Sequence, residues 1–216
     1  MIKILESFKK NIGILAVLCF CYFISSELLK YVLNLNTLIY NNLAENLTTE
    51  QIEKLFMQAR KWQLLGYVLL PLLLFLKTQI IAGVLGIGAY LFNKKITHKT
   101  LWGIVLKAEF IFLLVGVLKI VWFNFFQTNY TLEDVQFYYP LSMLSVVGNN
   151  NLEPWYIYPL QTLNVFEIVY WIVIALLIDK ALKENSNSGI KIVASSYGPA
   201  LLIWVVSIMF FTLNMS

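Results

Sequence analysis

Long apolar runs separated by short polar or basic segments set the pattern of this chain. Five such runs cover residues 12–29, 64–92, 101–125, 162–182 and 192–213. A hydrocarbon layer about 30 Å thick needs about 20 apolar residues in a helix that rises about 1.5 Å per residue. The pattern predicts an all-α, polytopic integral membrane protein with five transmembrane helices, forming a single membrane domain over residues 1–216.

The second run is longer than such a layer requires. As a helix, residues 64–92 would extend about 43 Å, so the helix must tilt, kink or project. Pro71 lies within it and offers a kink, because proline removes a backbone donor and crowds the preceding turn.

Residues 30–62, between the first two runs, keep an apolar stripe among polar side chains. Thr48 and Gln51 form a capping-box pattern that predicts the start of a second helix in this segment. The apolar residues expected on one face of that helix are Ile52, Leu55, Phe56, Ala59 and Trp62. We favour an extramembrane antiparallel hairpin whose two stripes bury each other; the alternative is an amphipathic helix lying on the lipid headgroups.

Residues 126–160 form an aromatic segment without Lys or Arg. Within it, residues 141–147 are apolar but too short to span, which suits an interfacial or re-entrant piece. Aromatic side chains at this level are typical of contacts with headgroups or with a protein partner. The candidate outer interface consists of Phe137, Tyr138, Tyr139, Trp155, Tyr156 and Tyr158.

Composition supports the membrane interpretation and gives it an orientation. Hydrophobic residues make up 59% of the chain and charged residues 13%, against about 25% charged in soluble domains. The basic residues gather before the first run and after the second and fourth, which predicts a cytoplasmic N-terminus and an outside C-terminus. The net charge of +4 therefore indicates topology and not nucleic-acid binding; the expected partners are membrane lipid and other membrane proteins or a second copy.

Charged residues also lie inside the apolar runs. Lys107 is close enough to the cytoplasmic edge to snorkel, and Glu27 and Asp179 are at run ends, which leaves Lys77, Glu109, Lys119 and Glu167 as the deeper charges. An isolated charge at mid-bilayer costs about 2.5–3.5 kcal/mol on insertion scales, so such residues are usually paired. Antiparallel runs place Lys77 and Glu109 at similar depth, and Lys119 and Glu167 near the outer end. We predict these two intramembrane ion pairs, which are either structural or part of a proton or substrate site.

The residue inventory indicates no enzyme, metal site or cofactor. The only histidine, His98, lies in a basic loop, and Cys19 and Cys21 point to different faces of the first helix. A metal centre needs a larger ligand set, and the serines lack a plausible base.

Two stretches carry a family resemblance. The segment PWYIYPLQTLNVFEIVYW, within residues 139–180, and KWQLLGYVLLPLLLFLK at residues 61–77 resemble bacterial Yip1-like membrane proteins, especially those of Bacteroidetes-type organisms. The resemblance covers most of the chain. It implies five spans in the cytoplasmic (inner) membrane of a bacterium, with a cytoplasmic N-terminus, an outside C-terminus and no catalytic residues.

Two functions remain open. The first is a non-enzymatic adaptor or assembly subunit that binds other membrane proteins or lipid. The alternative is a small-solute or ion permease, or a transporter subunit, that uses the intramembrane Lys and Glu residues. A polar, water-accessible cavity at mid-bilayer would favour the permease, whereas closed ion pairs would favour the adaptor.

Overall fold

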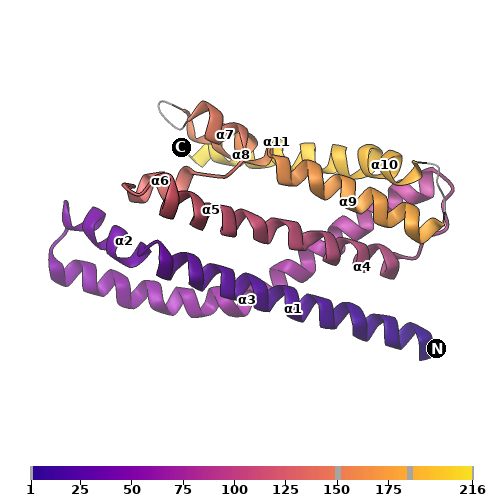
Figure 1. Ribbon diagram of the computed structural model, residues 1–216, viewed down its shortest axis with the longest axis horizontal. Coiled ribbons are helices and arrows are strands. Elements are labelled where there is room, and N and C mark those ends of the chain that lie inside the picture. The colour runs from indigo at the N-terminus through magenta and orange to yellow at the C-terminus, as the bar shows by residue number, and fades with distance from the viewer. Residues whose placement is uncertain (1, 149–151, 184–186, 216) are drawn as a thin grey trace.

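The computed structural model describes residues 2–148, 152–183 and 187–215, with side chains from Phe8 onward, and all regular structure in these ranges is helical. The predicted all-α class is confirmed. The long helices run along one axis in alternating directions, which places the N-terminus at one end and the C-terminus at the other (Figure 1). In chain order they are α1 (Ile2–Val32), α3 (Thr49–Leu91), α4 (His98–Ala108) with α5 (Leu113–Phe125), α9 (Val165–Leu182) and α11 (Gly198–Met215).

Three helical segments are long and apolar enough to cross a membrane by length and composition. They are Phe8–Val32, Thr49–Leu91 and Ser188–Met215. Their outward surfaces expose many large Leu, Ile, Val and Phe side chains, an arrangement that is stable where lipid takes the place of water. Three of the five predicted apolar runs thus form long membrane-compatible helices.

The other two runs differ from the prediction for local reasons. Residues 101–125 are not one α-helix, because the 3₁₀ helix η1 (Glu109–Phe112) separates α4 from α5. Helix α9 has only 18 residues and includes Glu167, Asp179 and Lys180.

The fifth run begins earlier than predicted, with α10 (Ser188–Ile192) and the π-helical turn η2 (Val193–Tyr197).

Residues 30–62 form an antiparallel pair of helices. After Asn34, whose left-handed φ of 48° ends the straight course of α1, helix α2 (Leu35–Ala44) leads to the capping box of Thr48 and Gln51, where α3 begins. Helix α2 packs against α3 and against α6 (Leu132–Phe137). The antiparallel pairing is the one favoured from the sequence, but no residue of α2 is buried, so the two apolar stripes do not bury each other as predicted.

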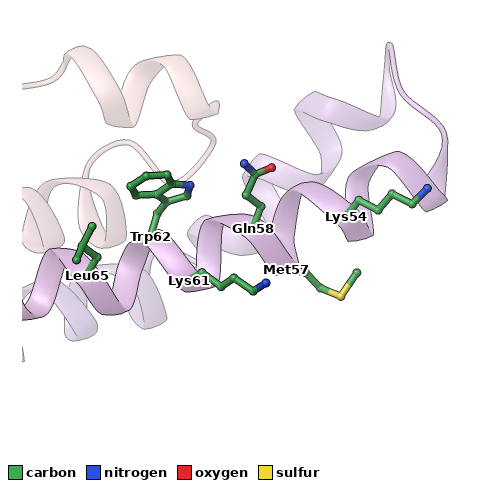
Figure 2. Close-up of a pocket in the computed structure, with 6 residues that line it drawn as sticks. All are labelled: Lys54, Met57, Gln58, Lys61, Trp62 and Leu65. Atoms are coloured by element: carbon green, nitrogen blue, oxygen red, sulfur yellow. The ribbon is translucent and has the colours of Figure 1, made fainter.

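Three of the five residues predicted on the buried face of α3 are exposed instead: Leu55, Ala59 and Trp62. Ile52 is buried as expected, but Trp62 is 64% exposed on the outward face of α3 (Figure 2). The first half of α3 runs beside α1, and its second half crosses towards α10 (Figure 1). It continues through Pro71 as one helix.

The described residues between α5 and α9, 126–148 and 152–164, fold back across one end of the bundle. After α6, the short helix α7 (Met143–Val147) leads to α8 (Pro154–Thr162), which packs on α11. The backbone closes on itself where Met143 N–H donates to the Leu163 carbonyl (2.9 Å) and Val165 N–H to the Leu141 carbonyl (3.1 Å). As a result, α9 begins part-way along the bundle and not at its end (Figure 1).

The main core surrounds α4 at the N-terminal end of the bundle. Helix α4 packs against α1, α3 and α9, and six of its apolar residues are buried: Leu101, Trp102, Ile104, Val105, Leu106 and Ala108. Helices α9 and α10 approach so closely that a Cβ added at Gly189 would lie 2.0 Å from the Ala175 carbonyl oxygen. The polar sites described below adjoin this tightly packed end.

Candidate functional site: two carboxylates within the bundle

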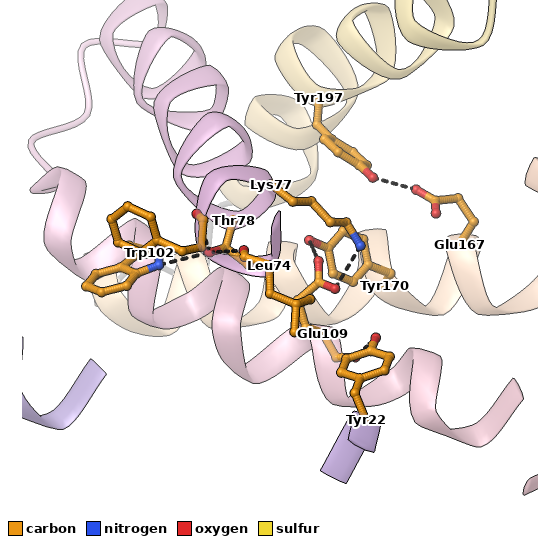
Figure 3. A network of polar contacts seen from close by, with 10 residues as sticks. Tyr22, Leu74, Lys77, Thr78, Trp102, Glu109, Glu167, Tyr170 and Tyr197 are labelled. Atoms are coloured by element: carbon orange, nitrogen blue, oxygen red, sulfur yellow. Dashed lines mark hydrogen bonds and ion pairs between the residues drawn. The ribbon is translucent and has the colours of Figure 1, made fainter. Parts of the chain in front are cut away.

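Glu109 is a fully buried acid whose two carboxylate oxygens are both hydrogen-bonded. Its side chain is 0% exposed, Lys77 Nζ donates to Oε2 at 2.8 Å, and the Tyr170 hydroxyl donates to Oε1 at 3.0 Å (Figure 3). Because Lys77 is on α3 and Tyr170 on α9, the carboxylate joins three segments of the chain. A buried charge persists only when it is paired and hydrogen-bonded in this way.

Lys77 reaches Glu109 from the surface of α3. Its side chain is 48% exposed, and Nζ also lies 4.9 Å from the centroid of the Phe112 ring, at the end of η1. A cation over an aromatic face gains further electrostatic stabilisation. Beside it, Thr78 accepts a hydrogen bond from Trp102 Nε1 (3.1 Å), which ties α3 to α4.

Glu167 is the second acid of the network. Its Oε1 accepts hydrogen bonds from Trp171 Nε1 (2.9 Å) and from the Tyr197 hydroxyl (2.8 Å). The Tyr170 and Tyr197 rings have centroids 5.7 Å apart, so the two carboxylate groups are joined by a pair of tyrosines (Figure 3). Tyr197 is the last residue of η2, and π-helical turns of this kind are frequent at functional sites.

The structure brings together one of the two predicted ion pairs. Lys77 and Glu109 meet, whereas Lys119 forms no ion pair with Glu167 in the part of the chain that is described. The prediction for Lys119 and Glu167 is wrong because it assumed that α9 begins at the outer end of the bundle. The fold-back through α7 and α8 moves Glu167 deeper, next to Tyr197. Lys119 lies ten residues, or about 15 Å, along the chain from Glu109.

Sequence reasoning missed the tyrosine and tryptophan donors. Glu167 and Trp171 are four apart on one helix, a spacing that places side chains on the same face and that could have indicated their contact. Tyr197 had no such signal, because its direction depends on the π-helical turn in which it lies.

A second polar cluster lies where the hairpin joins α1. The Tyr67 hydroxyl donates to Glu27 and accepts a hydrogen bond from Lys30 Nζ (2.8 Å), while Lys30 Nζ also donates to Glu27 Oε1 (2.9 Å). Gln63 donates to the same Tyr67 hydroxyl. We call Glu27, Lys30, Gln63 and Tyr67 the hairpin-base cluster; it fixes α3 to α1 ten residues before Lys77.

The predicted aromatic interface divides into two groups that largely contact the protein itself. The Tyr138 ring stacks on Trp122 of α5, with centroids 5.2 Å apart. On α8, the Tyr158 hydroxyl accepts a hydrogen bond from Trp204 Nε1 of α11 (2.8 Å). Of the six residues, only Tyr156 is exposed, and Phe137, Tyr139 and Trp155 are half-buried. The segment therefore covers the bundle instead of presenting one continuous outer surface.

The described arrangement is suited to a structural role. With both oxygens of Glu109 satisfied by the protein, the network can act as a clamp between α3, η1 and α9. It also holds a second carboxylate, Glu167, whose contacts among the described residues are neutral donors and not a lysine. No protein-family model, curated protein or solved structure matches the chain, so the Yip1-like resemblance stays a prediction from the residues.

Proposed function

We propose that this chain is a non-enzymatic membrane adaptor with five spans and a cytoplasmic N-terminus, as Yip1-like proteins would have. The alternating directions of α1, α3, α4–α5, α9 and α10–α11 support the span number (Figure 1). The basic residues that gather at the N-terminal end of the bundle support the orientation. Outside the N-terminal segment they are Lys94, Lys95, Lys99, Lys180, Lys183 and Lys191.

The hairpin-base cluster sets the level of the bundle within the bilayer in this proposal. A polar group of four side chains is stable where helices leave the hydrocarbon. Lys77 follows Tyr67 by ten residues, or about 15 Å, which is half of a 30 Å hydrocarbon layer. The Lys77–Glu109 pair then lies near mid-bilayer, where an unpaired charge would be most costly.

The observation that carries the adaptor function is the length of α3 beyond this cluster. Thr49 precedes Tyr67 by 18 residues, so the helix projects about 27 Å past the hairpin base. Helix α2 braces only one side of it, and the outward side, including Met57 and Trp62, is exposed. An exposed apolar surface held on a rigid projection is typical of a protein-binding element.

The closed state of the carboxylates favours the adaptor over the permease. Glu109 is fully buried with both oxygens bonded to protein groups. An open hollow on the described surface is on the hairpin, and neither Glu109 nor Glu167 lines it.

Photo-cross-linking in intact native membranes tests the adaptor. A benzophenone amino acid is placed at Gln58 on the hairpin, and at Ile203, an exposed apolar residue of α11, as the matched control. We expect a discrete protein adduct from position 58 and lipid adducts alone from position 203. A chain that cross-links to no protein from position 58, and that runs as a lone protomer after gentle extraction, would refute the proposal.

The permease alternative rests on one observation: Glu109 is buried and paired with the half-exposed Lys77, while the partly buried Glu167 has only neutral donors among the described residues. Proteoliposomes with a trapped pH-sensitive dye test it. Proton entry that exceeds that of empty liposomes and is lost in Glu167→Gln would favour a proton-coupled carrier. An equal dye response from proteoliposomes and empty liposomes would reject the permease and favour the clamp as the role of the network.

A further inference from the structure

A mixed basic and apolar stripe runs along the outward face of the projecting half of α3. It lines an open hollow of about 750 Å³ and consists of Lys54, Met57, Gln58, Lys61, Trp62 and Leu65 (Figure 2). These residues recur at three- and four-residue spacing and so share one helix face. Buried Ile52 lies on the opposite face, which packs within the hairpin. We call these six residues the outward stripe.

The stripe is longer than a layer of lipid headgroups. From residue 54 to residue 65 it extends about 16 Å along the helix, whereas the headgroup region on one side of a bilayer is about 5–7 Å thick. Trp62 and Leu65, near the hairpin-base cluster, can lie among headgroups. Met57 is 63% exposed and precedes Tyr67 by ten residues, or about 15 Å, which places it in water. Lipid alone therefore leaves half of the stripe uncovered.

The charges of the stripe select the chemistry of what covers it. Neither Lys54 nor Lys61 forms an ion pair within the described part of the chain. The two lysines lie seven residues apart, two helical turns, with Met57 and Gln58 between them. A complementary surface needs apolar side chains for Met57 and Trp62 and acidic side chains for the lysines.

We propose that the outward stripe docks an acidic amphipathic helix of a partner protein. This inference rests on the adaptor function and names the partner's docking element. A helix of about 11–14 residues matches the stripe in length, with apolar residues at i, i+3 or i+4, and i+7 against Met57, Trp62 and Leu65. Acidic residues two turns apart on its flanks reach Lys54 and Lys61. Trp62 is the anchor, because large exposed aromatics dominate such interfaces once they are covered.

Peptide binding to the full-length chain in phosphatidylcholine nanodiscs tests the proposal. The probe is a labelled designed helix with Leu at the apolar positions and Glu on the flanks, and its binding is followed by fluorescence anisotropy. The matched control peptide carries Lys in place of Glu. We expect the acidic helix to bind at least about ten-fold more tightly than the basic one, with affinity that falls as salt is added.

Protein variants locate the binding on the stripe. Lys54→Glu with Lys61→Glu should weaken binding about ten-fold, since two favourable pairs become repulsive. Trp62→Ala should weaken it as much. Arg60→Glu, a charge reversal of the same helix outside the stripe, should leave affinity within about two-fold. Equal binding of both peptides, or equal effects of Arg60→Glu and the double reversal, would overturn the proposal.

Other occupants give distinct results. Displacement of the acidic helix by nanodiscs that contain phosphatidylglycerol would assign the stripe to anionic lipid and overturn the proposal, as would self-association of the chain through Trp62. If the acidic helix fails to bind while position 58 still cross-links to a protein in native membranes, the adaptor stands and the acidic-helix partner is rejected. If neither occurs, both proposals fail.

Discussion

The packed end of the bundle and the projecting hairpin differ in how far their apolar side chains are buried. Around α4, apolar side chains are enclosed by α1, α3 and α9, and the one buried acid of that region, Glu109, has two donors. On the hairpin, Ile52 is buried but its outward neighbours Met57 and Trp62 are not. The first region is complete within a single chain, whereas the second leaves its surface to be covered by something else. Stability should therefore depend on the first region and partner binding on the second.

The largest loss of stability should follow Glu109→Ala. The substitution removes the acceptor of Lys77 and Tyr170, and breaking a buried ion pair costs about 3–5 kcal/mol when both partners are buried. Because Lys77 is half exposed, we expect a loss of about 2–3 kcal/mol in the free energy of unfolding, measured by denaturation in mixed micelles. Lys77→Met with Glu109→Leu should recover much of it, and a double variant as unstable as the single one would contradict the clamp.

Gly189→Ala should cause the next largest loss of stability. The added methyl group would lie 2.0 Å from the Ala175 carbonyl oxygen, which is backbone and cannot rotate away. Overpacking of this kind costs about 1–3 kcal/mol, and α9 and α10 must separate to relieve it. Gly13→Ala is the matched control, since a Cβ there meets nothing within 4 Å. A thermal midpoint equal to that of the control would show that the two helices are not in tight contact.

Tyr197→Phe should have a smaller effect, because it removes one hydrogen bond to Glu167 and keeps the ring against Tyr170. A single net hydrogen bond contributes about 0.5–1.5 kcal/mol. Trp171 still donates to the same oxygen, so the expected loss lies at the low end of that range. The unfolding free energy measured beside that of Tyr90→Phe, an exposed tyrosine, isolates the hydroxyl's contribution.

The sequence predicts part of the packed end of the bundle, and two acidic residues show which part. Antiparallel neighbouring runs place Lys77 and Glu109 at equal depth, so their contact follows from counting residues. Counting residues gives the wrong depth for Glu167, because α7 and α8 fold back and α9 therefore begins part-way along the bundle. That fold-back depends on backbone hydrogen bonds between residues 141–143 and 163–165. The spacing of apolar residues along the sequence does not predict such bonds.

The hairpin shows a different limit. The capping box at Thr48 and the apolar positions of residues 30–62 predict two helices, and both are present. The orientation of α3 about its own axis is set by tertiary contacts, namely those of Ile52 and Tyr67 with the rest of the chain. Trp62 therefore lies outside the packed face, although its spacing is compatible with that face.

A pH effect of small size should arise at α6, which α2 covers. The Thr131 backbone N–H and hydroxyl hold the pKa of Asp134 below its usual value. This contribution to α6 is complete above the unfolded-state pKa of about 3.9 and is lost as the pH falls through the lower folded-state pKa. Hydrogen exchange of residues 132–137, corrected for intrinsic rates, should show protection that declines at acid pH, and Asp134→Asn should show less of that decline.

The smallest effect on stability should come from Trp62→Ala, the substitution expected to weaken partner binding most. The indole is 64% exposed, so the unfolding free energy should change by less than about 0.5 kcal/mol. Trp102→Ala, in the buried core, provides the contrast within the same residue type. If Trp62→Ala destabilised the isolated chain as strongly as Trp102→Ala, the hairpin would be part of the fold's own core. The division between a self-sufficient bundle and an unsatisfied projection would then have no physical basis.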